Sequence, residues 1–264
     1  MIRLDGVYFE RAGRPVLDGV ALCVNPGELV VVHGPRGGGK SALLAVAAAR
    51  LAPDQGAVAI CSRDLAGLQR ASLPLVRRNV AYLPPSPPLI DDETALENVL
   101  LALAVRGADL ETAQAAAVKA LDLLGIGGCA EQPVTALSAG ERQLVAVARA
   151  LAGPPAVAVL DEPAAGLGDD DRERLLATLV AAQNDGTTLL VATASEGFAS
   201  RVVACGGRRT RLEAGRLLGG LPGIALVRSR PDERTADGDR GGAAGARGAE
   251  AGRGAGLWAE RRSS

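Results

Sequence analysis

A glycine-rich loop between two apolar segments is the feature that most restricts what this chain can fold into. The loop GPRGGGKS (34–41) follows Leu29–Val32, a short apolar run typical of strands buried on both faces of a parallel sheet. It precedes the apolar, alanine-rich segment Ser41–Leu51, which is typical of a helix packed on such a sheet. A strand, a loop with the pattern G-x-x-x-x-G-K-[ST] and a helix, in this order, predict a phosphate-binding loop.

The composition of the loop explains how it would hold phosphate. Glycines let backbone N–H groups turn inward around phosphate oxygens, and the N-terminus of the following helix favours an anion. Lys40 can reach the β- and γ-phosphates of a nucleotide, and the Ser41 hydroxyl can ligate Mg²⁺. The predicted nucleotide-binding residues of the loop are Gly34, Pro35, Arg36, Gly37, Gly38, Gly39, Lys40 and Ser41.

A second motif, AVAVLDEP (156–163), places two acids directly after an apolar run. In parallel sheets, ligands bind at the carboxyl ends of the strands. Asp161 is therefore a candidate for the Mg²⁺ shell, together with Ser41. Glu162 is the candidate catalytic residue, because a carboxylate there can orient or deprotonate an attacking water.

The third motif is LSAGERQLVAVARAL (137–151). Together the three stretches resemble the ATP-binding cassette (ABC) ATPases, whose signature reads LSGGQ or LSGGE, over about residues 1–218. Within that family, LPLVRRNV, ALENVLLALAVRG and ALDLLGIGG look most similar to the FtsE and lipoprotein-export ATPases.

The resemblance implies a fold, cofactors and partners. The fold is an α/β P-loop NTPase of ABC type, with a mixed central sheet, flanking helices, an N-terminal antiparallel β part and an inserted helical subdomain. The cofactors are ATP and Mg²⁺, and the partners are a second cassette, in a homo- or heterodimer, and an integral membrane permease subunit. Each cassette offers its signature to the other's nucleotide, so Ser138, Ala139 and Gly140 would face the partner's γ-phosphate. Ala139 replaces a family glycine, so a methyl group stands where backbone should approach closely.

The periodicity along the chain indicates how these parts are distributed. Strand-like alternation marks 2–9 and 16–24, and further short strands are predicted at Ala57–Cys61, Ala156–Leu160 and Thr187–Ala192. The pattern is helical over about 86–153, the predicted helical subdomain, and again over the amphipathic DDDRERLLATLVAAQ. We expect an ATP-binding domain at 1–220 and a disordered Gly/Ala/Arg-rich tail at 221–264, which carries Trp258.

Several positions depart from the family pattern. Pro85 stands where the Q-loop glutamine belongs, Gly168 replaces the D-loop aspartate, and Ala194 replaces the H-loop histidine. The aromatic residue that stacks on adenine should fall near Arg11, with two aromatics just before it. His33, the one histidine of the chain, lies just before the phosphate-binding loop and is interpreted as a strand-end packing residue.

These departures leave two functions in competition. The first is an ATP-hydrolysing subunit that drives a membrane transport-type complex, with slow turnover because one lost transition-state donor costs on the order of 10²–10³ in rate. The second is a nucleotide-binding regulatory or degenerate cassette that hydrolyses little. The retained Glu162 favours the first, and the substitutions at Pro85, Gly168 and Ala194 favour the second. A DNA-repair ATPase is poorly supported, since the chain has no long heptad arm.

Composition narrows the cellular setting. A net charge of −1 gives no indication of nucleic-acid binding. No apolar run reaches 18 residues and the start lacks a signal-peptide core, so we expect a cytoplasmic protein that a partner holds at the inner face of the membrane. The four cysteines are far apart and are expected to be small buried residues rather than metal ligands: Cys23, Cys61, Cys129 and Cys205.

Overall fold

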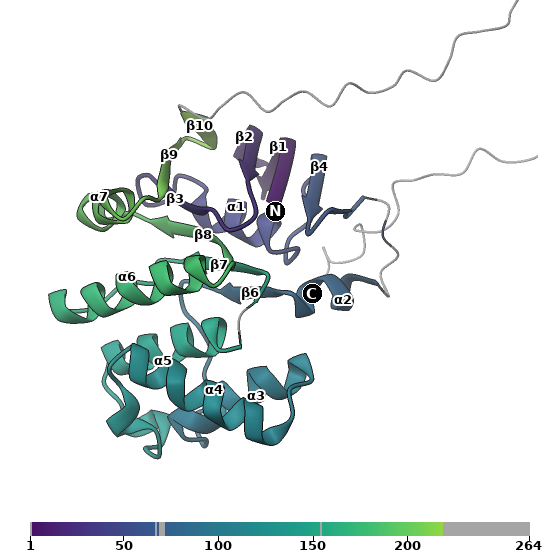
Figure 1. Cartoon of the computed structure of the whole chain (residues 1–264). Coiled ribbons are helices and arrows are strands. Elements are labelled where there is room, and N and C mark those ends of the chain that lie inside the picture. Colours follow the sequence, from purple (N-terminus) through teal and green to yellow (C-terminus); the bar gives the residue numbers. More distant parts are fainter. Residues whose placement is uncertain (1, 67, 69–71, 154, 219–264) are drawn as a thin grey trace, which may run out of the picture. The chain divides into compact units, whose positions relative to one another are not determined.

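The computed structural model describes residues 2–66, 68, 72–153 and 155–218, and within them two β-sheets enclose one helix (Figure 1). The larger sheet, as far as the chain is described, has the strand order β10-β9-β3-β8-β7-β6 and is parallel except between β10 and β9. Its strands are β3 (Leu29–His33), β6 (Val80–Leu83), β7 (Val157–Asp161), β8 (Thr188–Thr193), β9 (Arg208–Glu213) and β10 (Arg216–Leu218). Because β3, β7 and β8 are parallel neighbours, their carboxyl ends meet at one edge of the sheet.

The smaller sheet is antiparallel and is formed by the N-terminal part of the chain. Its order is β2-β1-β4-β5, with β1 (Ile2–Arg11), β2 (Arg14–Val24), β4 (Gln55–Ile60) and β5 (Arg63–Asp64). β1 and β2 form a hairpin whose turn, Ala12–Gly13, has positive φ at both residues, as the tight primed turns of hairpins require. Apolar side chains alternate along both strands and face the core, which is why this pattern is readable from the sequence.

Helix α1 (Lys40–Ala47) lies between the two sheets and contacts strands of both. Leu43, Leu44 and Val46 are buried against them, in a cluster with β1, β3 and β7. Burial of such a side chain contributes about 1.5–3 kcal/mol. The phosphate-binding loop is therefore anchored by a helix that cannot move without opening this core.

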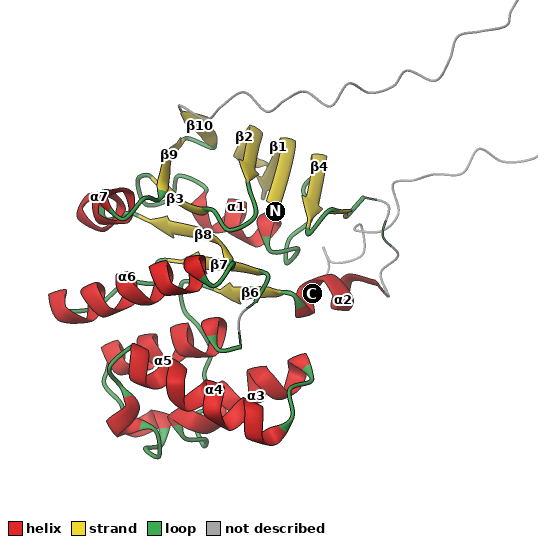
Figure 2. Ribbon diagram, viewed as in Figure 1, coloured by secondary structure: helices red, strands yellow, loops and turns green. Residues whose placement is uncertain are grey.

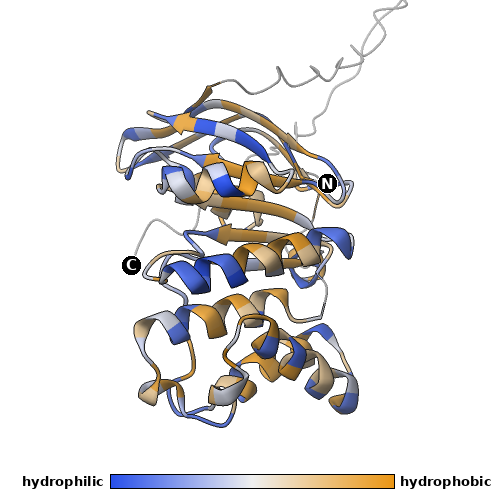
Figure 3. Ribbon diagram, turned by 60° about the vertical axis from the view of Figure 1, so that its left-hand side comes forward, coloured by the Kyte–Doolittle hydropathy of each residue, from blue (hydrophilic) through white to orange (hydrophobic). Residues whose placement is uncertain are grey.

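The opposite face of the larger sheet is covered by helices (Figure 2). α5 packs against α3 and α4, and α6 and α7 contact β8. The helices are α2 (Leu73–Arg78), α3 (Ala95–Arg106), α4 (Leu110–Leu123), α5 (Ala139–Leu151), α6 (Asp169–Asn184) and α7 (Glu196–Ala204), with 3₁₀ turns at Gly127–Cys129 and Val134–Ala136. Hydrophobic residues line the strands of the sheet, and the first turn of α6 is hydrophilic (Figure 3).

The α/β P-loop fold predicted from the motifs is confirmed, with a mixed sheet, flanking helices and an antiparallel N-terminal part. The boundaries need correction at several places. The first helix ends at Ala47 rather than at Leu51. Residues 86–94 are not helical, because the prolines at 87 and 88 interrupt a helix. A helix not predicted from the sequence follows Ala194, where Ser195 caps α7 by accepting a hydrogen bond from the Phe198 N–H.

The cysteine expectation is partly wrong. All four are free thiols, but Cys23 and Cys205 are exposed and the other two are half-buried. Cys23 occupies an outward-facing position of β2, and Cys205 follows the last turn of α7, so neither position reaches the core. The predicted tail at 221–264 and Trp258 lie outside the described residues.

Candidate functional site

The phosphate-binding loop leaves the end of β3 and turns into α1, and close backbone contacts require glycine at two of its positions, Gly34 and Gly39. Gly39 caps α1 with φ +98°, a left-handed conformation that favours glycine, and a Cβ atom there would lie 2.6 Å from the Val16 carbonyl oxygen. A Cβ atom on Gly34 would lie 2.0 Å from the carbonyl oxygen of Leu212. The loop is therefore shaped by its neighbours on β2 and β9, and larger residues at these positions would displace it.

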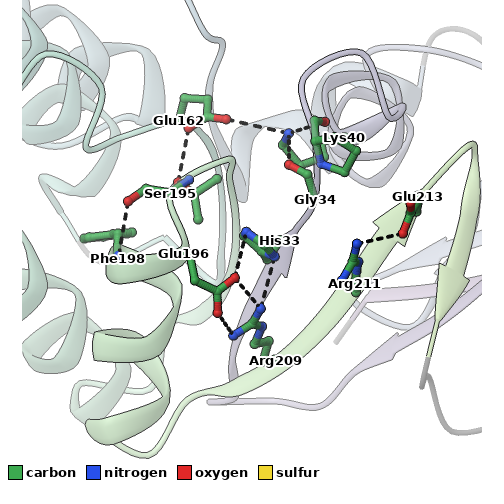
Figure 4. Close-up of polar contacts among 12 residues, drawn as sticks. His33, Gly34, Lys40, Glu162, Ser195, Glu196, Phe198, Arg209, Arg211 and Glu213 are labelled. Carbon is green, nitrogen blue, oxygen red and sulfur yellow. Dashed lines mark hydrogen bonds and ion pairs between the residues drawn. The ribbon is translucent and has the colours of Figure 1, made fainter.

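Lys40 is buried at the start of α1 and its ammonium group folds back over the loop (Figure 4). Nζ donates to the carbonyl oxygens of Gly34 at 2.9 Å and Pro35 at 3.0 Å, and lies 3.8 Å from Oε1 of Glu162. The ammonium thus stands between the loop and the acidic end of β7. Phosphate oxygens bound in the loop would compete with these carbonyl oxygens for its three N–H donors.

Asp161 ends β7 and is completely buried, and among the described residues neither of its carboxylate oxygens has a hydrogen bond of conventional geometry. Burial raises the pKa of this carboxyl group, and the negative charge of Glu162 raises it further, whereas Ser41 and Lys40 lower it. Buried, unpartnered carboxylate oxygens and a nearby hydroxyl are the oxygen donors that Mg²⁺ prefers. These residues therefore fit the ion expected with a nucleotide triphosphate.

Metal binding at this place would depend on the nucleotide. Within the described part of the chain, no group of three or more His, Cys, Asp or Glu side chains could hold an ion. Asp161 and Ser41 supply only part of an octahedral shell, and Mg²⁺ commonly completes such a shell with phosphate oxygens and water.

Glu162 follows Asp161 and is half-buried, with a backbone φ of +50° that non-glycine residues rarely adopt. The carboxylate contacts Lys40 through Oε1 (Figure 4). Its Oε2 atom accepts a hydrogen bond from the Thr193 hydroxyl at 3.2 Å. The Thr193 oxygen accepts in turn from the backbone N–H of Ser195 at 3.0 Å. The carboxylate is therefore held over the loop by groups from β8 and α1.

Five of the eight predicted loop residues and both predicted acids line one cavity of about 750 Å³, which has room for a nucleotide, whereas Gly34, Pro35 and Gly38 are not among its lining residues. The lining side chains come from the phosphate-binding loop, the ends of β7 and β8, the hairpin and α6. They are Arg11, Val16, Arg36, Gly37, Gly39, Lys40, Ser41, Ala42, Asp161, Glu162, Ala164, Ala165, Gly166, Arg172, Thr193, Ala194 and Ser195. The sequence prediction of a site built from the loop, Asp161 and Glu162 therefore corresponds to a single place.

The signature residues lie elsewhere. Ser138 caps α5 in a capping box with Glu141: the Ser138 side chain accepts from the Glu141 N–H at 3.2 Å, and the Glu141 carboxylate accepts from the Ser138 N–H at 2.8 Å. These hydrogen bonds lower the pKa of the Glu141 carboxyl group. Ser138 and Ala139 are exposed and, like Gly140, are not among the residues that line the cavity. The predicted signature residues therefore lie outside the cavity of their own chain.

The departures from the ABC pattern divide into those inside and outside the cavity. Ala194 lines it with a methyl group, and Arg11 lines it at the end of β1, where an aromatic residue was expected. Neither Tyr8, which is exposed, nor Phe9 is among the lining residues. Pro85 is exposed and lies outside the lining, and Gly168 caps α6 without a side chain.

Sequence reasoning missed three polar residues of this site, besides several small or apolar ones. Thr193 and Ser195 flank the position of the replaced histidine, and Arg172 reaches the cavity from the first turns of α6. A polar residue at the very end of the apolar run of β8 was the only signal for Thr193. Arg172 pairs with Asp169 at 2.9 Å, which from sequence is an ordinary helical i,i+3 pair.

The surroundings of His33 are more polar than the predicted packing role implies. Nδ1 lies 3.1 Å from an amino nitrogen of Arg209, and Nε2 lies 3.3 Å from a carboxylate oxygen of Glu196. Glu196 also pairs with Arg209, which lowers the pKa of its carboxyl group (Figure 4). His33 does not line the cavity, so it cannot stand in for the missing imidazole.

Comparison with known proteins decides the family. A sequence profile described as ABC transporter matches residues 17–165. The chain belongs to the ABC transporter family of ATPases. The lipoprotein-releasing system ATP-binding protein LolD of Cereibacter sphaeroides is 37% identical over 83% of this chain and 99% of its own length. The cell division ATP-binding protein FtsE of Bacillus subtilis is 34% identical over 73% of this chain and 85% of its own length.

Solved structures agree with the ABC assignment. The dimeric structure of MJ0796, a bacterial ABC transporter cassette, superposes with a TM-score of 0.75 at 30% identity, covering 82% of this cassette and 96% of that chain. MJ0796 bound to ADP and Pi in a post-hydrolysis dimer superposes with the same score at 29% identity. Within its described residues this cassette has no helix that combines the length and the apolar character needed to cross a bilayer.

Proposed function

We propose that this cassette binds Mg·ATP and hydrolyses it slowly, and that the cycle energises a membrane complex. The observation that carries the proposal is the convergence of Lys40, Asp161 and Glu162 on one cavity in which Ala194 replaces an imidazole. Backbone N–H groups of the loop and Lys40 would bind the phosphates, and Glu162 would orient the attacking water. The groups that hold the ground state are present, and a donor to the γ-phosphate is missing.

Ser41 and Asp161 would hold the Mg²⁺ that accompanies the nucleotide. An ion held by these residues would supply positive charge that offsets the negative charge developing on the phosphates during phosphoryl transfer. For this ion Asp161 must be ionised, although burial favours its protonated form. Lys40 assists, because its positive charge lowers the pKa of the neighbouring carboxyl group.

A second cassette would complete the site. Ser138, Ala139 and Gly140 stand at the exposed N-terminus of α5, outside their own nucleotide cavity. A helix N-terminus with free N–H groups favours a phosphate of another molecule. The Ala139 methyl group would weaken this contact, which also agrees with slow turnover.

The membrane subunit would dock on the side of the molecule where α3 meets β6. Arginines line a cleft of about 250 Å³ there, and no acidic side chain belongs to its lining within the described residues. The arginines are Arg50, Arg77, Arg78, Arg106 and Arg149. Exposed Leu101 and Val105 lie beside them on α3. A cytoplasmic segment of the permease with apolar and acidic side chains would suit this cleft and hold the cassette at the inner face of the membrane.

The alternative is a cassette that binds ATP without turning it over. It is favoured by the positions of Pro85, Gly168 and Ala194, each of which removes a side chain that the family uses around the γ-phosphate or the dimer seam. It differs from the main proposal in one observable, because both require nucleotide binding but only the main proposal requires a working Glu162.

Phosphate release from purified wild type and from Glu162→Gln tests the proposal. We expect slow Mg²⁺-dependent release from wild type and a loss of about 100-fold, to background, in the variant, since a general base contributes about 10²–10⁴. Mg·ATP affinity should be similar in both proteins. Binding by wild type with no release would instead establish the non-hydrolysing subunit.

A further inference from the structure

Gln143 is a buried glutamine whose amide group reaches from the signature helix to the catalytic loop. It lies on α5, five residues after Ser138, and is 8% exposed. Nε2 is 3.3 Å from the carbonyl oxygen of Glu162 and 3.2 Å from that of Pro163. The amide has two N–H donors, so both are directed at the backbone that carries the catalytic carboxylate.

The backbone at Glu162 needs such support. Its φ of +50° lies in the left-handed region, and this conformation costs a non-glycine residue free energy. It persists only where the surrounding structure fixes the backbone. The Glu162 N–H donates to the Ala192 carbonyl oxygen at 2.9 Å, and its carbonyl oxygen accepts from Ala165 at 3.0 Å as well as from Gln143. Of these three hydrogen-bond partners, Ala192 belongs to β8 and Ala165 to the segment after β7, whereas Gln143 belongs to α5.

The connection between Ser138 and Gln143 is stiff. The capping box fixes the first turn of α5, and five residues of helix span about 7.5 Å. Leu144, Val145 and Val147 on the same helix are buried in the core under the sheet. A displacement of the N-terminus of α5 should therefore be transmitted to the Gln143 amide, because this part of the helix is rigid.

We propose that Gln143 is a positioning residue that couples the signature of this cassette to its own Glu162. This inference rests on the proposed function, since it needs a dimer in which the partner's nucleotide sits against Ser138. A nucleotide bound there would displace α5, and the Gln143 amide would then shift the carbonyl groups of residues 162 and 163. As a result, the Glu162 carboxylate would exchange its contacts with Thr193 and Lys40 for a contact with the attacking water. One ATP thereby reports its presence to the hydrolytic centre of the other, and the coupling is reciprocal by linkage.

The test compares Gln143→Leu and Gln143→Met with Gln114→Leu. Both Gln143 variants introduce an apolar side chain of similar size and remove both donors, and the second preserves the unbranched shape if the first folds poorly. Gln114 is exposed on α4, so its replacement makes the same chemical change away from the site. For each protein we would measure the Kd for Mg·ATP, the turnover number, and hydrogen–deuterium exchange of residues 162–168 against that of α5.

We expect the Gln143 variants to lower turnover about tenfold with Kd changed less than twofold, and to speed exchange in 162–168 while α5 stays protected. Mg·ATP should slow amide hydrogen exchange in residues 162–168 more in wild type than in these variants. Ser138→Arg, which leaves Gln143 in place, should reduce this effect of Mg·ATP. Gln114→Leu should match wild type in every measurement. The inference is overturned if exchange at 162–168 is unchanged, or if turnover and Kd worsen in parallel with lost protection of α5, because Gln143 would then only fill space.

Failure of the proposed function is seen separately. If wild type binds Mg·ATP but releases no phosphate, the exchange measurements still decide the coupling, because they do not depend on turnover. If wild type does not bind Mg·ATP, the proposed function fails, and the coupling that rests on it fails as well.

Discussion

The nucleotide cavity has two sides with different degrees of completeness. On the side of β3, α1 and β7, every group expected to grip the triphosphate and its metal is present, and the supporting helix is buried between two sheets. On the side of the loops that should sense the γ-phosphate, Ala194 and Pro85 lack the expected polar side chains, and Gly168 lacks an acid. In the proposed function the first side would contribute to ground-state binding and the second mainly to the transition state, so the two could be lost independently.

The largest effect should come from breaking the intact side. Lys40→Ala removes the ammonium group that stands over the loop, so Mg·ATP should no longer stabilise the protein. Mg·ATP at about 100 times its Kd should add about 2.7 kcal/mol to the free energy of unfolding of wild type. Thermal melts with and without Mg·ATP measure this. Lys119→Ala, at the only other lysine and on an exposed face of α4, is the control and should retain the full shift.

An intermediate effect is expected where the two sides meet. Thr193→Val removes the hydrogen bond to Glu162, and turnover should fall about tenfold, equivalent to about 1.4 kcal/mol, with little change in Kd. Thr210→Val is the matched control, because Thr210 is buried and its hydroxyl has no hydrogen-bond partner in the part of the chain that the structure describes. Equal turnover in the two variants would show that Thr193 does not orient the carboxylate.

The smallest effect concerns the stability of the ligand-free protein. Because burial raises the folded pKa of Asp161, folding favours its protonated form, and stability falls as pH rises from the ordinary carboxyl range through the folded pKa. Asp161→Asn should remove this fall and raise the Tm at neutral pH by about 2–4 °C, the shift that about 1 kcal/mol produces in a domain of this size.

The same variant should lose the Mg²⁺-dependent part of nucleotide stabilisation, because an amide is a poorer ligand than a carboxylate. Melts from pH 4 to 8, with and without Mg·ATP, distinguish these effects, and Asp91→Asn on an exposed turn is the control. A lower Tm for Asp161→Asn at neutral pH would contradict the assignment of a buried, unpartnered charge.

Local patterns predicted the fold around the phosphate-binding loop well. The apolar run of β3, the glycine loop and the acids after β7 are contiguous in sequence, and the fold follows from their order. α7 and β9 were missed, because Glu196–Ala204 is short and β9 reads RRTRLE, with arginines where alternation would show apolar residues.

The contacts that hold Glu162 could not be predicted, because they join residues far apart in sequence. Thr193 is 31 residues from Glu162, and Gln143 is 19 residues from it. Such pairs follow from which strands become neighbours and how α5 packs beneath them. No periodicity within either segment contains that information.

Restoring the incomplete side tests the central claim most directly. Phosphate release and Mg·ATP affinity would be measured for wild type, for Ala194→His with Pro85→Gln, and for that double variant carrying Glu162→Gln. If the grip on ATP is intact and only γ-phosphate contacts are missing, the double variant should hydrolyse at least about tenfold faster at similar Kd, within the 10²–10³ that one donor can supply. Glu162→Gln should abolish the gain. Turnover that is already fast in wild type, or a double variant that binds more tightly without hydrolysing faster, would contradict the account.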